Sequence, residues 1–553
     1  TNKLKQLDLS YNYFDSTVPS ELGLFTELQY LSLCDNDFVG SIPPELGLLS
    51  TSLSVLDVSH NELSNTIPTE FGQLSNVLQY LTIQNNNLRG SLPSELGQLH
   101  KLHTLKISHN YIVRRIPSEL FPKSNNLRIL DISENLFTGE LPLTLWQSPQ
   151  LQSLRLQENY LEGNAMAHYL QPAFHNTLQE FDISSNYFTG DLDIISQIPH
   201  TKLRSLNVSH NRMTGKLFSS YYSYYHSHQL LPLLLPPLEV LDVSDNKLTG
   251  TIPFPLLGKA MNNTLKSLDL SCNSFYYNDD NNNHLISSHI GSLTQLSVLN
   301  LQSTNLGGTI PTELGLLSRL TMLRLDKNKI NNDLPTTIGQ LTSLQRFHAS
   351  YNTISGRIPS EIGCMTNLQL FELAFNYISR LPNELWSLCK LETLDLRDVQ
   401  RRRGENNNNK NTDSSIGSIP SQIITSLTSL KHLLLQDTGM SGTIPSELWL
   451  LPSLERLELA SNKFVGSIVI PNNNSSSDNN NDNNNNSDNN NNNNNMGRRI
   501  RRRRILSNST VANDDDAKSL LFHQRNTTNL TKVDLSDNIL TGSIPSDFFT
   551  RLT

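Results

Sequence analysis

A single motif, Leu-x-x-Leu-x-Leu-x-x-Asn-x-Leu-x-Gly-x-Ile-Pro, recurs from one end of this chain to the other. A clean copy is formed by Leu78, Leu81, Ile83, Asn86, Leu88, Gly90, Leu92 and Pro93. Nineteen copies can be aligned, most of them 24 or 25 residues apart. A fixed period of this length predicts a solenoid, in which each unit packs on its neighbours and buries a thin continuous core. The 553 residues are therefore expected to form one long surface suited to recognition rather than several globular domains.

Each repeat is expected to begin with a short strand on the inner curve. In the copy around Leu105, apolar and polar residues alternate, which predicts a half-buried strand with Leu105 and Ile107 inside and Lys106 in solvent. Asn110 follows where the chain turns away, and a buried Asn there can bond backbone groups that otherwise have no partner. Pro117 stops further pairing, so a short helical or irregular return is expected.

The Asn residues of successive repeats are predicted to stack into a structural ladder. The best-defined members are Asn36, Asn61, Asn86, Asn110, Asn135, Asn328, Asn352 and Asn376. Three copies depart from Asn, with Thr304, Thr438 and Val399. Threonine can supply part of the hydrogen bonding, but valine cannot, so the ladder is expected to break at Val399.

The second half of the motif, as in Asn246-Lys247-Leu248-Thr249-Gly250-Thr251-Ile252-Pro253, resembles the plant-type leucine-rich repeat family. The resemblance covers nearly all of the chain outside its insertions. It implies an α/β solenoid: a right-handed, L domain-like horseshoe of about nineteen repeats, with a concave parallel β-sheet and little helix. It also implies the recognition ectodomains of receptor-like kinases and receptor-like proteins. Fold does not fix function, so the resemblance narrows the biochemistry only to a class.

Insertions interrupt the repeats. We expect a leucine-rich repeat solenoid over 1–471, with loop insertions near 218–236, 276–290 and 400–415. Residues 472–525 are Asn- and Arg-rich and cannot bury enough apolar surface to offset chain entropy, so a disordered insertion is predicted. Residues 526–553 resume the motif as a truncated terminal repeat. Because both ends lie inside a repeat and no polar cap follows, the sequence is interpreted as a fragment of a longer protein.

Composition limits the partners. The net charge of −8 and the pI near 6.0 argue against a nucleic-acid partner. The four cysteines, Cys34, Cys272, Cys364 and Cys389, are too scattered for a disulfide framework or a paired-Cys zinc site. No stretch reaches the roughly 18 apolar residues of a membrane helix. Membrane attachment is therefore expected only through segments outside this chain.

Catalytic motifs are lacking. The sequence has no kinase signatures, Walker loop, Gly-x-Ser-x-Gly or His-Glu-x-x-His, so we predict no enzyme, no cofactor and no metal site within this chain. This interpretation is compatible with a kinase domain elsewhere in the protein. Polar groups that mimic metal ligands near 478–489, 226–228 and 279–284 are interpreted as solvated loops. The Arg clusters at 401–403 and 498–504 are open to three interpretations: solvated charge, an anionic partner, or a site for a basic-specific protease.

Several glycosylation sequons occur, and two that lie outside the long Asn-rich tract are the better candidates. They begin at Asn207 and Asn262, and both become candidates if the chain is secreted. Asn207 is expected to project from the concave strand.

Aspartate recurs midway along the predicted inner strands, which we interpret as repeat consensus rather than catalysis. Repeats thirteen to fifteen differ, because aromatic and basic side chains replace the usual residues there. The predicted ligand-binding residues are Arg324, Lys327, Arg346, His348, Tyr351, Leu370, Glu372 and Phe375. Corresponding positions on adjacent strands lie about 5 Å apart. An exposed cluster of this composition is typical of interface hot spots.

The sequence thus predicts a non-catalytic solenoid that recognises a protein or peptide. The leading hypothesis is the ectodomain of a cell-surface receptor-like protein or receptor kinase, on the extracellular side of the plasma membrane, with a co-receptor as a further partner. An intracellular scaffold and an adhesion or cell-wall protein remain alternatives.

Overall fold

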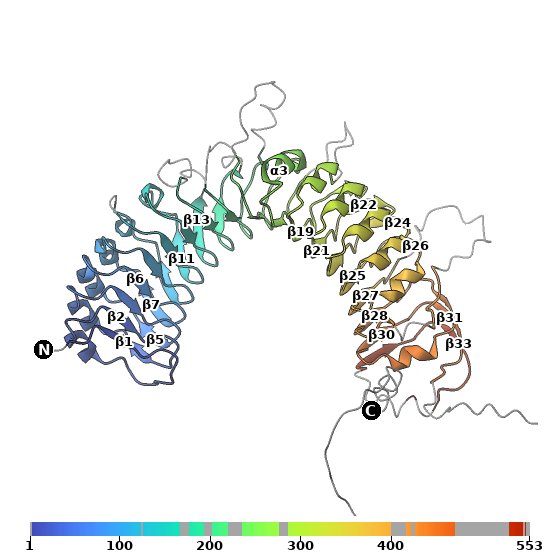
Figure 1. Ribbon diagram of the computed structural model, residues 1–553, viewed down its shortest axis with the longest axis horizontal. Coiled ribbons are helices and arrows are strands. Elements are labelled where there is room, and N and C mark those ends of the chain that lie inside the picture. Colours follow the sequence, from blue (N-terminus) through green and yellow to red (C-terminus); the bar gives the residue numbers. More distant parts are fainter. Residues whose placement is uncertain are drawn as a thin grey trace, which may run out of the picture.

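The chain forms an arch whose inner side is a long parallel β-sheet (Figure 1). The computed structural model describes residues 3–122, 125–165, 176–192, 202–218, 235–275, 286–399, 416–421, 426–470, 530–545 and 548. Nineteen strands within these ranges pair in chain order, each with the corresponding strand of the next repeat. The predicted solenoid with a concave parallel sheet and little α-helix is confirmed.

The strands of the inner sheet are three residues long. They are β1 (Gln6–Asp8), β2 (Tyr30–Ser32), β4 (Val55–Asp57), β6 (Tyr80–Thr82), β8 (Thr104–Lys106), β10 (Ile129–Asp131), β12 (Ser153–Arg155), β14 (Glu180–Asp182), β16 (Ser205–Asn207), β17 (Val240–Asp242), β18 (Ser267–Asp269), β19 (Val298–Asn300), β21 (Met322–Arg324), β23 (Arg346–His348), β25 (Leu370–Glu372), β27 (Thr393–Asp395), β28 (His432–Leu434), β30 (Arg456–Glu458) and β32 (Lys532–Asp534).

The core lies directly behind these strands. The middle residue of each strand points inward, and Leu323, Phe347 and Phe371 are fully buried. The rings of Phe347 and Phe371 stack with centroids 5.5 Å apart, so the core is continuous from one repeat to the next. Burying a side chain of this size contributes roughly 1.5–3 kcal/mol. The first and third residues of each strand are left facing the concave side, because side chains alternate along a strand.

A second set of strands runs beside the inner sheet and was not predicted from the sequence. The Asn-x-Leu-x-Gly segment, expected only to turn, pairs with the same segment of the next repeat. These strands are β3 (Val39–Ser41), β5 (Glu62–Asn65), β7 (Asn87–Ser91), β9 (Tyr111–Arg114), β11 (Leu136–Gly139), β13 (Tyr160–Asn164), β15 (Tyr187–Thr189), β20 (Gly307–Gly308), β22 (Lys329–Asn332), β24 (Thr353–Arg357), β26 (Tyr377–Arg380), β29 (Ser441–Gly442), β31 (Lys463–Gly466) and β33 (Ile539–Leu540). The alternation of apolar residues and glycine in that segment is the signal that could have revealed them.

Short helices return the chain along the outer side. Most begin directly after the proline of the motif, whose fixed φ suits a helical start. The 3₁₀ helices are η1 (Ser20–Leu24), η2 (Pro44–Leu48), η3 (Thr69–Leu74), η4 (Ser94–Gln98), η5 (Ser118–Leu120), η6 (Leu145–Gln147), η8 (Ser288–Ser292), η9 (Thr312–Leu316), η10 (Thr336–Gln340), η11 (Ser360–Cys364), η12 (Asn383–Ser387) and η13 (Ser446–Leu450), and one α-helix is α3 (Phe254–Met261). Helices of adjacent repeats lie so close that a Cβ at Gly97 would sit 1.9 Å from the carbonyl oxygen of Glu119. None of the helices in the described ranges has the length and apolar character needed to cross a bilayer.

The predicted insertions fall largely outside the described residues, which omit 219–234, 276–285, 400–415 and 471–529. The sheet nevertheless continues across the longest of these gaps. Leu457 of β30 pairs in register with Val533 of β32, so the repeat after the gap stacks directly on the repeat before it.

Candidate functional site

A row of buried asparagines supports the concave face from behind. Asn110 shows the pattern: its Nδ2 donates to the carbonyl oxygens of Ile83, Ile107 and Ser108 at 3.1, 3.1 and 3.2 Å. Its Oδ1 accepts a hydrogen bond of 3.0 Å from the backbone N–H of Leu88. One side chain therefore joins its own repeat to the preceding one. The same bonds form at Asn36, Asn61, Asn86, Asn135, Asn328, Asn352 and Asn376.

Two of the departures from asparagine behave differently. Thr304 donates its hydroxyl to the carbonyl oxygen of Leu301 at 2.6 Å, which replaces one bond of the usual set. Val399 is buried and has no polar side-chain atom to contribute.

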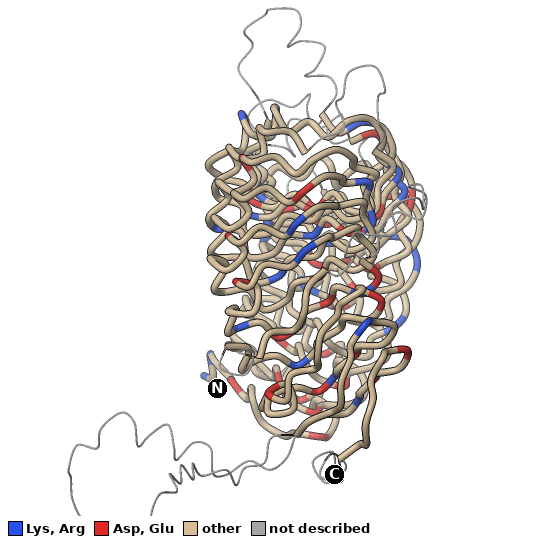
Figure 2. The backbone as a smooth tube through the Cα atoms, turned by 90° about the vertical axis from the view of Figure 1, so that its right-hand side faces the viewer, with Lys and Arg blue, Asp and Glu red and all other residues tan. Residues whose placement is uncertain are grey.

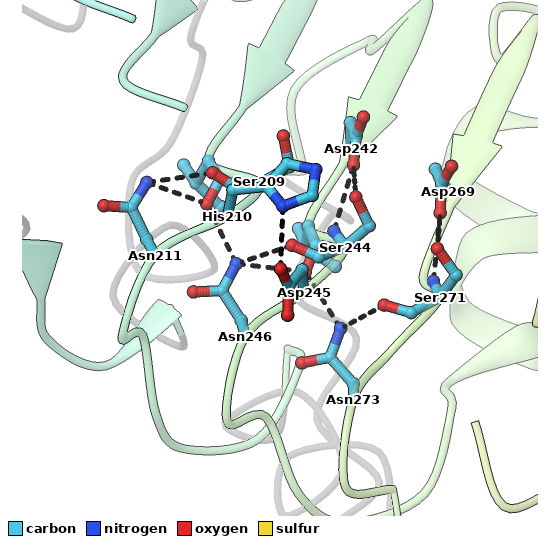
Figure 3. Close-up of polar contacts among 12 residues, drawn as sticks. Ser209, His210, Asn211, Asp242, Ser244, Asp245, Asn246, Asp269, Ser271 and Asn273 are labelled. Atoms are coloured by element: carbon cyan, nitrogen blue, oxygen red, sulfur yellow. Dashed lines mark hydrogen bonds and ion pairs between the residues drawn. The ribbon is translucent and has the colours of Figure 1, made fainter. Parts of the chain in front are cut away.

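On the concave surface, seven of the nineteen described strands end in an Asp-x-Ser pair, in which the serine hydroxyl and N–H satisfy the aspartate within its own repeat. Asp242 Oδ1 accepts hydrogen bonds from the Ser244 N–H and hydroxyl at 3.0 and 2.7 Å, and Asp269 does the same with Ser271 at 3.0 and 2.6 Å (Figure 3). Equivalent pairs involve Asp8, Asp57, Asp131, Asp182 and Asp534. The aspartate row thus has a structural explanation, because each carboxylate fixes the end of its own strand.

Burial changes the acidity of two of these carboxyls. Desolvation raises the pKa of Asp182 and of Asp242 above its ordinary value and outweighs the opposing effect of the serine hydrogen bonds.

Repeats thirteen to fifteen lack the Asp-x-Ser pair. Strand register aligns Arg324, His348 and Glu372 side by side. Here the polar contacts cross between repeats: His348 Nδ1 lies 2.6 Å from Glu372 Oε2. Arg324 instead contacts Asp326 in its own repeat, at 3.4 Å from Nη2 to Oδ2.

An aromatic column stands next to these residues. Lys327, Tyr351 and Phe375 occupy equivalent positions with φ of 53°, 57° and 57°. The rings of Tyr351 and Phe375 stack with centroids 4.2 Å apart and an interplanar angle of 13°. Both remain solvent-accessible, at 52% and 37% exposure. Most repeats carry a small or polar residue at this left-handed position, where a bulky side chain is strained.

The outer column completes the predicted set. Arg346 is exposed and pairs in register with Leu370, which is half-buried. All eight predicted residues therefore lie on three adjacent repeats of one face, and we call them the central patch: Arg324, Lys327, Arg346, His348, Tyr351, Leu370, Glu372 and Phe375. The structure brings His348 to Glu372 and Tyr351 to Phe375, whereas Arg324 turns toward Asp326.

Three residues beside the patch were missed. Asp326 is buried and contacts Arg324. Here the acidic residue lies two positions after the strand end, whereas in an Asp-x-Ser pair it lies at the strand end. Arg397 stands where a serine would follow Asp395 and donates to that carboxylate at 2.7 Å. Glu458 is buried and contacts Arg456, Lys532 and, at 4.0 Å, Arg397. The signal available in the sequence was the loss of serine two residues after the strand end.

The two candidate glycosylation sites differ in their surroundings. Asn207 replaces the aspartate of an Asp-x-Ser pair, and its Nδ2 donates to Asp182 Oδ2 and Ser184 Oγ, both at 3.2 Å. Asn262 is exposed at the end of α3. A glycan on Asn207 would have to break the two inter-strand bonds, whereas Asn262 carries no such cost.

Lys and Arg positions are interspersed with Asp and Glu positions along the part of the backbone seen in Figure 2. Together, the stacked core, the Asn row and the open patch define a rigid repeat solenoid built for recognition.

The chain belongs to the leucine-rich repeat family. The model described as "Leucine-rich repeat region" matches residues 261–397, and "Leucine rich repeat" matches 100–161. Single "Leucine Rich Repeat" units match 3–25, 27–49, 52–74, 77–99, 237–258 and 529–550. Comparison with curated proteins found no match.

Solved structures of plant receptors have the same fold. The ectodomain of the Arabidopsis receptor kinase HAESA, in complex with an IDA peptide hormone, is 30% identical; the match covers 84% of this chain and 71% of that one, with a TM-score of 0.69. The ectodomain of GASSHO1/SCHENGEN3 from Arabidopsis thaliana, in complex with CASPARIAN STRIP INTEGRITY FACTOR 2, is 27% identical over 84% of this chain and 54% of that one, with a TM-score of 0.67. A leucine-rich repeat protein of Leptospira interrogans is 26% identical over 82% and 96%, with a TM-score of 0.53.

Proposed function

We propose that this chain is the ligand-binding region of a cell-surface receptor-like protein or receptor kinase, and that an extended peptide or protein segment binds along its concave face at the central patch. Nineteen strands about 4.8 Å apart give an inner face of roughly 90 Å. A surface of that length suits an extended ligand better than a small metabolite, which needs an enclosed pocket. The leucine-rich repeat ectodomain fold is typical of domains that bind ligands without transforming them.

The observation that carries this proposal is the stacked pair Tyr351 and Phe375. The two rings stack on each other and remain exposed at 52% and 37%. A ligand that covers them would gain free energy by burying this apolar surface. Arg346 adds a charge on the same face, and aromatic residues with arginine dominate interface hot spots.

The similar receptors support the ligand class. HAESA and GASSHO1/SCHENGEN3 were each solved with a peptide or protein factor bound. HAESA was also solved together with the co-receptor SERK1. We therefore propose a peptide ligand for this chain, with a co-receptor as a second partner and membrane attachment through segments outside the sequence described here.

The test uses a displayed library of random 12-residue peptides selected on the full chain. Selected peptides are then titrated against the double variant Arg346→Ala with Phe375→Ala. Loss of two hot-spot side chains should weaken binding by roughly a hundredfold or more, since each is worth about 2 kcal/mol and about 1.4 kcal/mol corresponds to tenfold. The melting transition should stay in place because neither side chain is part of the core.

The matched control is His210→Ala with Asp245→Ala. These residues occupy the same column as Tyr351 and Phe375 on two other adjacent strands, and His210 Nδ1 lies 2.7 Å from Asp245 Oδ2. Peptide binding should be unchanged in this control. Equal affinities for the wild type and the Arg346/Phe375 variant would rule the central patch out as the binding site.

Location requires a separate test, because the fold itself also occurs in the Leptospira protein. Native protein treated with a glycosidase should lose mass, with Asn262 the favoured acceptor. No mass loss, together with fractionation into the cytosol, would favour the intracellular scaffold. A glycosylated protein that binds cell-wall material but no peptide would favour the adhesion alternative.

A further inference from the structure

Three metal-ligating side chains meet beside the aromatic column. Asp326, His348 and Glu372 come from three consecutive repeats, and each offers one ligand atom within 4.8 Å of the other two. The sequence concealed this cluster, because its members are 22 and 24 residues apart and belong to no local motif. The cluster forms because strands β21, β23 and β25 pair in register.

One oxygen in this cluster has no partner. Asp326 is only 6% exposed, and among the described residues its Oδ1 accepts no hydrogen bond. Its Oδ2 faces Arg324 at 3.4 Å, which leaves Oδ1 as a buried acceptor. In the Asp-x-Ser pairs the aspartate lies at the strand end, where a serine hydroxyl and N–H satisfy its Oδ1, as Ser244 does for Asp242. Asp326 lies two residues after the strand end, at the serine position. A buried carboxylate oxygen left without a partner is costly, so its presence needs an explanation.

The imidazole is held in a defined orientation. His348 Nδ1 lies 2.6 Å from Glu372 Oε2, with side-chain exposures of 16% and 28%. Metal-binding histidines commonly direct one ring nitrogen to a carboxylate, which fixes the ring and leaves the other nitrogen for the metal. Glu372 therefore fits either of two roles, a ligand or the group that orients His348.

We propose that Asp326, His348 and Glu372 form a binding site for one divalent transition-metal cation of the zinc class. Mixed imidazole and carboxylate donors suit Zn²⁺ and its neighbours, whereas Ca²⁺ and Mg²⁺ take oxygen ligands. In a tetrahedral site, ligand atoms about 2.1 Å from a zinc ion lie roughly 3.4 Å apart, so side-chain rotations have to draw the three ligand atoms closer together than the observed limit of 4.8 Å. The cation would satisfy Asp326 Oδ1.

Arg324 is the charge that opposes a cation here. Among the described residues its ion pair is with Oδ2 of Asp326, and the carboxylates of Asp326 and Glu372 together carry one more charge than its guanidinium. A guanidinium on the far oxygen also orients the carboxylate, which is the usual task of a residue behind a metal ligand. The inference does not depend on the identity of any peptide ligand, because the three donors belong to this chain.

The experiment is a Co²⁺ titration of the full, tag-free chain at pH 7.5, followed by visible absorption, with Zn²⁺ competition to measure affinity. The thiols are first alkylated with iodoacetamide, so that cysteine cannot bind the metal. We expect one Co²⁺ per chain, a visible ligand-field band, displacement by Zn²⁺, and no displacement by millimolar Mg²⁺ or Ca²⁺.

Variants assign the site. His348→Gln and Asp326→Asn should each lower Co²⁺ affinity by at least roughly tenfold, and Glu372→Gln by about ten- to a hundredfold, the range found when ligands or their orienting groups are lost. His210→Gln is the matched control, because His210 has a carboxylate partner at 2.7 Å but belongs to no three-residue cluster in the described ranges. Its Co²⁺ affinity should equal that of the wild type.

Three outcomes would overturn the proposal. The first is the absence of a ligand-field band, which would mean that the contact between His348 and Glu372 completes the cluster without a metal. The second is Co²⁺ binding that survives both His348→Gln and Asp326→Asn, which would place the metal elsewhere. The third is an equal loss in His210→Gln. The melting transition of each variant is measured first, to show that the variant folds. If Asp326→Asn does not fold, His348→Gln still tests the site, because His348 is only half-buried.

Discussion

The repeats around Asp242 and those around His348 share one interior and differ on the surface. Asn246 and Asn352 each donate to a carbonyl of the preceding repeat at 2.9 Å. On the concave side, Asp242 bonds to Ser244 within its own repeat, whereas His348 bonds to Glu372 of the next. The side chain at the strand end is therefore bonded within its own repeat in the first region and to the next repeat in the second.

This difference shows that the residues that build the interior and the residues that face the concave side can vary independently. The Leu core and the Asn row hold the backbone in both regions, so surface residues can change without changing the fold. Where the internal pair is lost, as at His348, the side chain at the strand end contacts the neighbouring repeat instead. The comparison predicts equal effects for substitutions in the interior and unequal effects for substitutions on the surface.

The largest expected effect tests the shared interior. Asn246→Ala and Asn352→Ala should each lower the free energy of unfolding by roughly 3 kcal/mol, because several buried backbone groups lose their partners. Urea unfolding measures both, with the exposed Asn87→Ala as control and little change expected there. A loss at Asn352 much smaller than at Asn246 would break the claim that the interior is the same.

The strained aromatic position gives the next effect. Phe375→Gly should be more stable than Phe375→Ala by about 1 kcal/mol or more, because both remove the ring but only alanine keeps a Cβ at positive φ. The same order is expected for His210→Gly and His210→Ala, since φ there is 51°. Chemical denaturation of the four variants provides the measurement. An alanine variant as stable as its glycine partner would show that the left-handed backbone relaxes.

Burial should separate the two His–carboxylate pairs. His348 with Glu372 and His210 with Asp245 have similar distances of 2.6 and 2.7 Å, but side-chain exposures of 16% and 28% against 59% and 61%. Double-mutant cycles to alanine, run with a chelator present, should give a coupling free energy of about 1 kcal/mol for His348 with Glu372 and about 0.3 kcal/mol for the exposed pair. Equal couplings would mean that burial on this face has no energetic effect.

The sequence predicted the arch because its constraint is local and repeated. Leu105, Ile107 and Asn110 each have one role, and the role recurs in every copy. The second strand set was missed, since the Asn-x-Leu-x-Gly segment pairs only when stacked on a neighbour. The central patch was found as a change of residue type, but the approach of Asp326 to Glu372 depends on strand register, which no single repeat reveals.

The smallest expected effect is the pH dependence of stability, which should have opposite signs at Asp242 and Glu458. Burial raises the pKa of Asp242 above 3.8, with Asp269 adding to the rise and His210 opposing it. The stabilising contribution of Asp242 is therefore present below the unfolded-state pKa and lost as pH rises through the folded-state value. Glu458 differs: burial raises its pKa, but hydrogen bonds from Lys532 and Arg456 outweigh burial and hold it below 4.5. Its contribution is present above the unfolded-state pKa and lost as pH falls through the folded-state value.

Asp242→Asn should therefore gain stability relative to the wild type as pH rises from 4 to 7, and Glu458→Gln should lose it. Asparagine can keep the pair with Ser244, because Asn207 Oδ1 accepts from Ser209 N–H and hydroxyl at 3.1 and 2.8 Å. Urea midpoints measured across this pH range for the wild type and both variants give the two slopes. Slopes of the same sign would show that the internal Asp-x-Ser pair and the inter-repeat cluster at Glu458 do not differ electrostatically, which would remove the physical basis of the comparison.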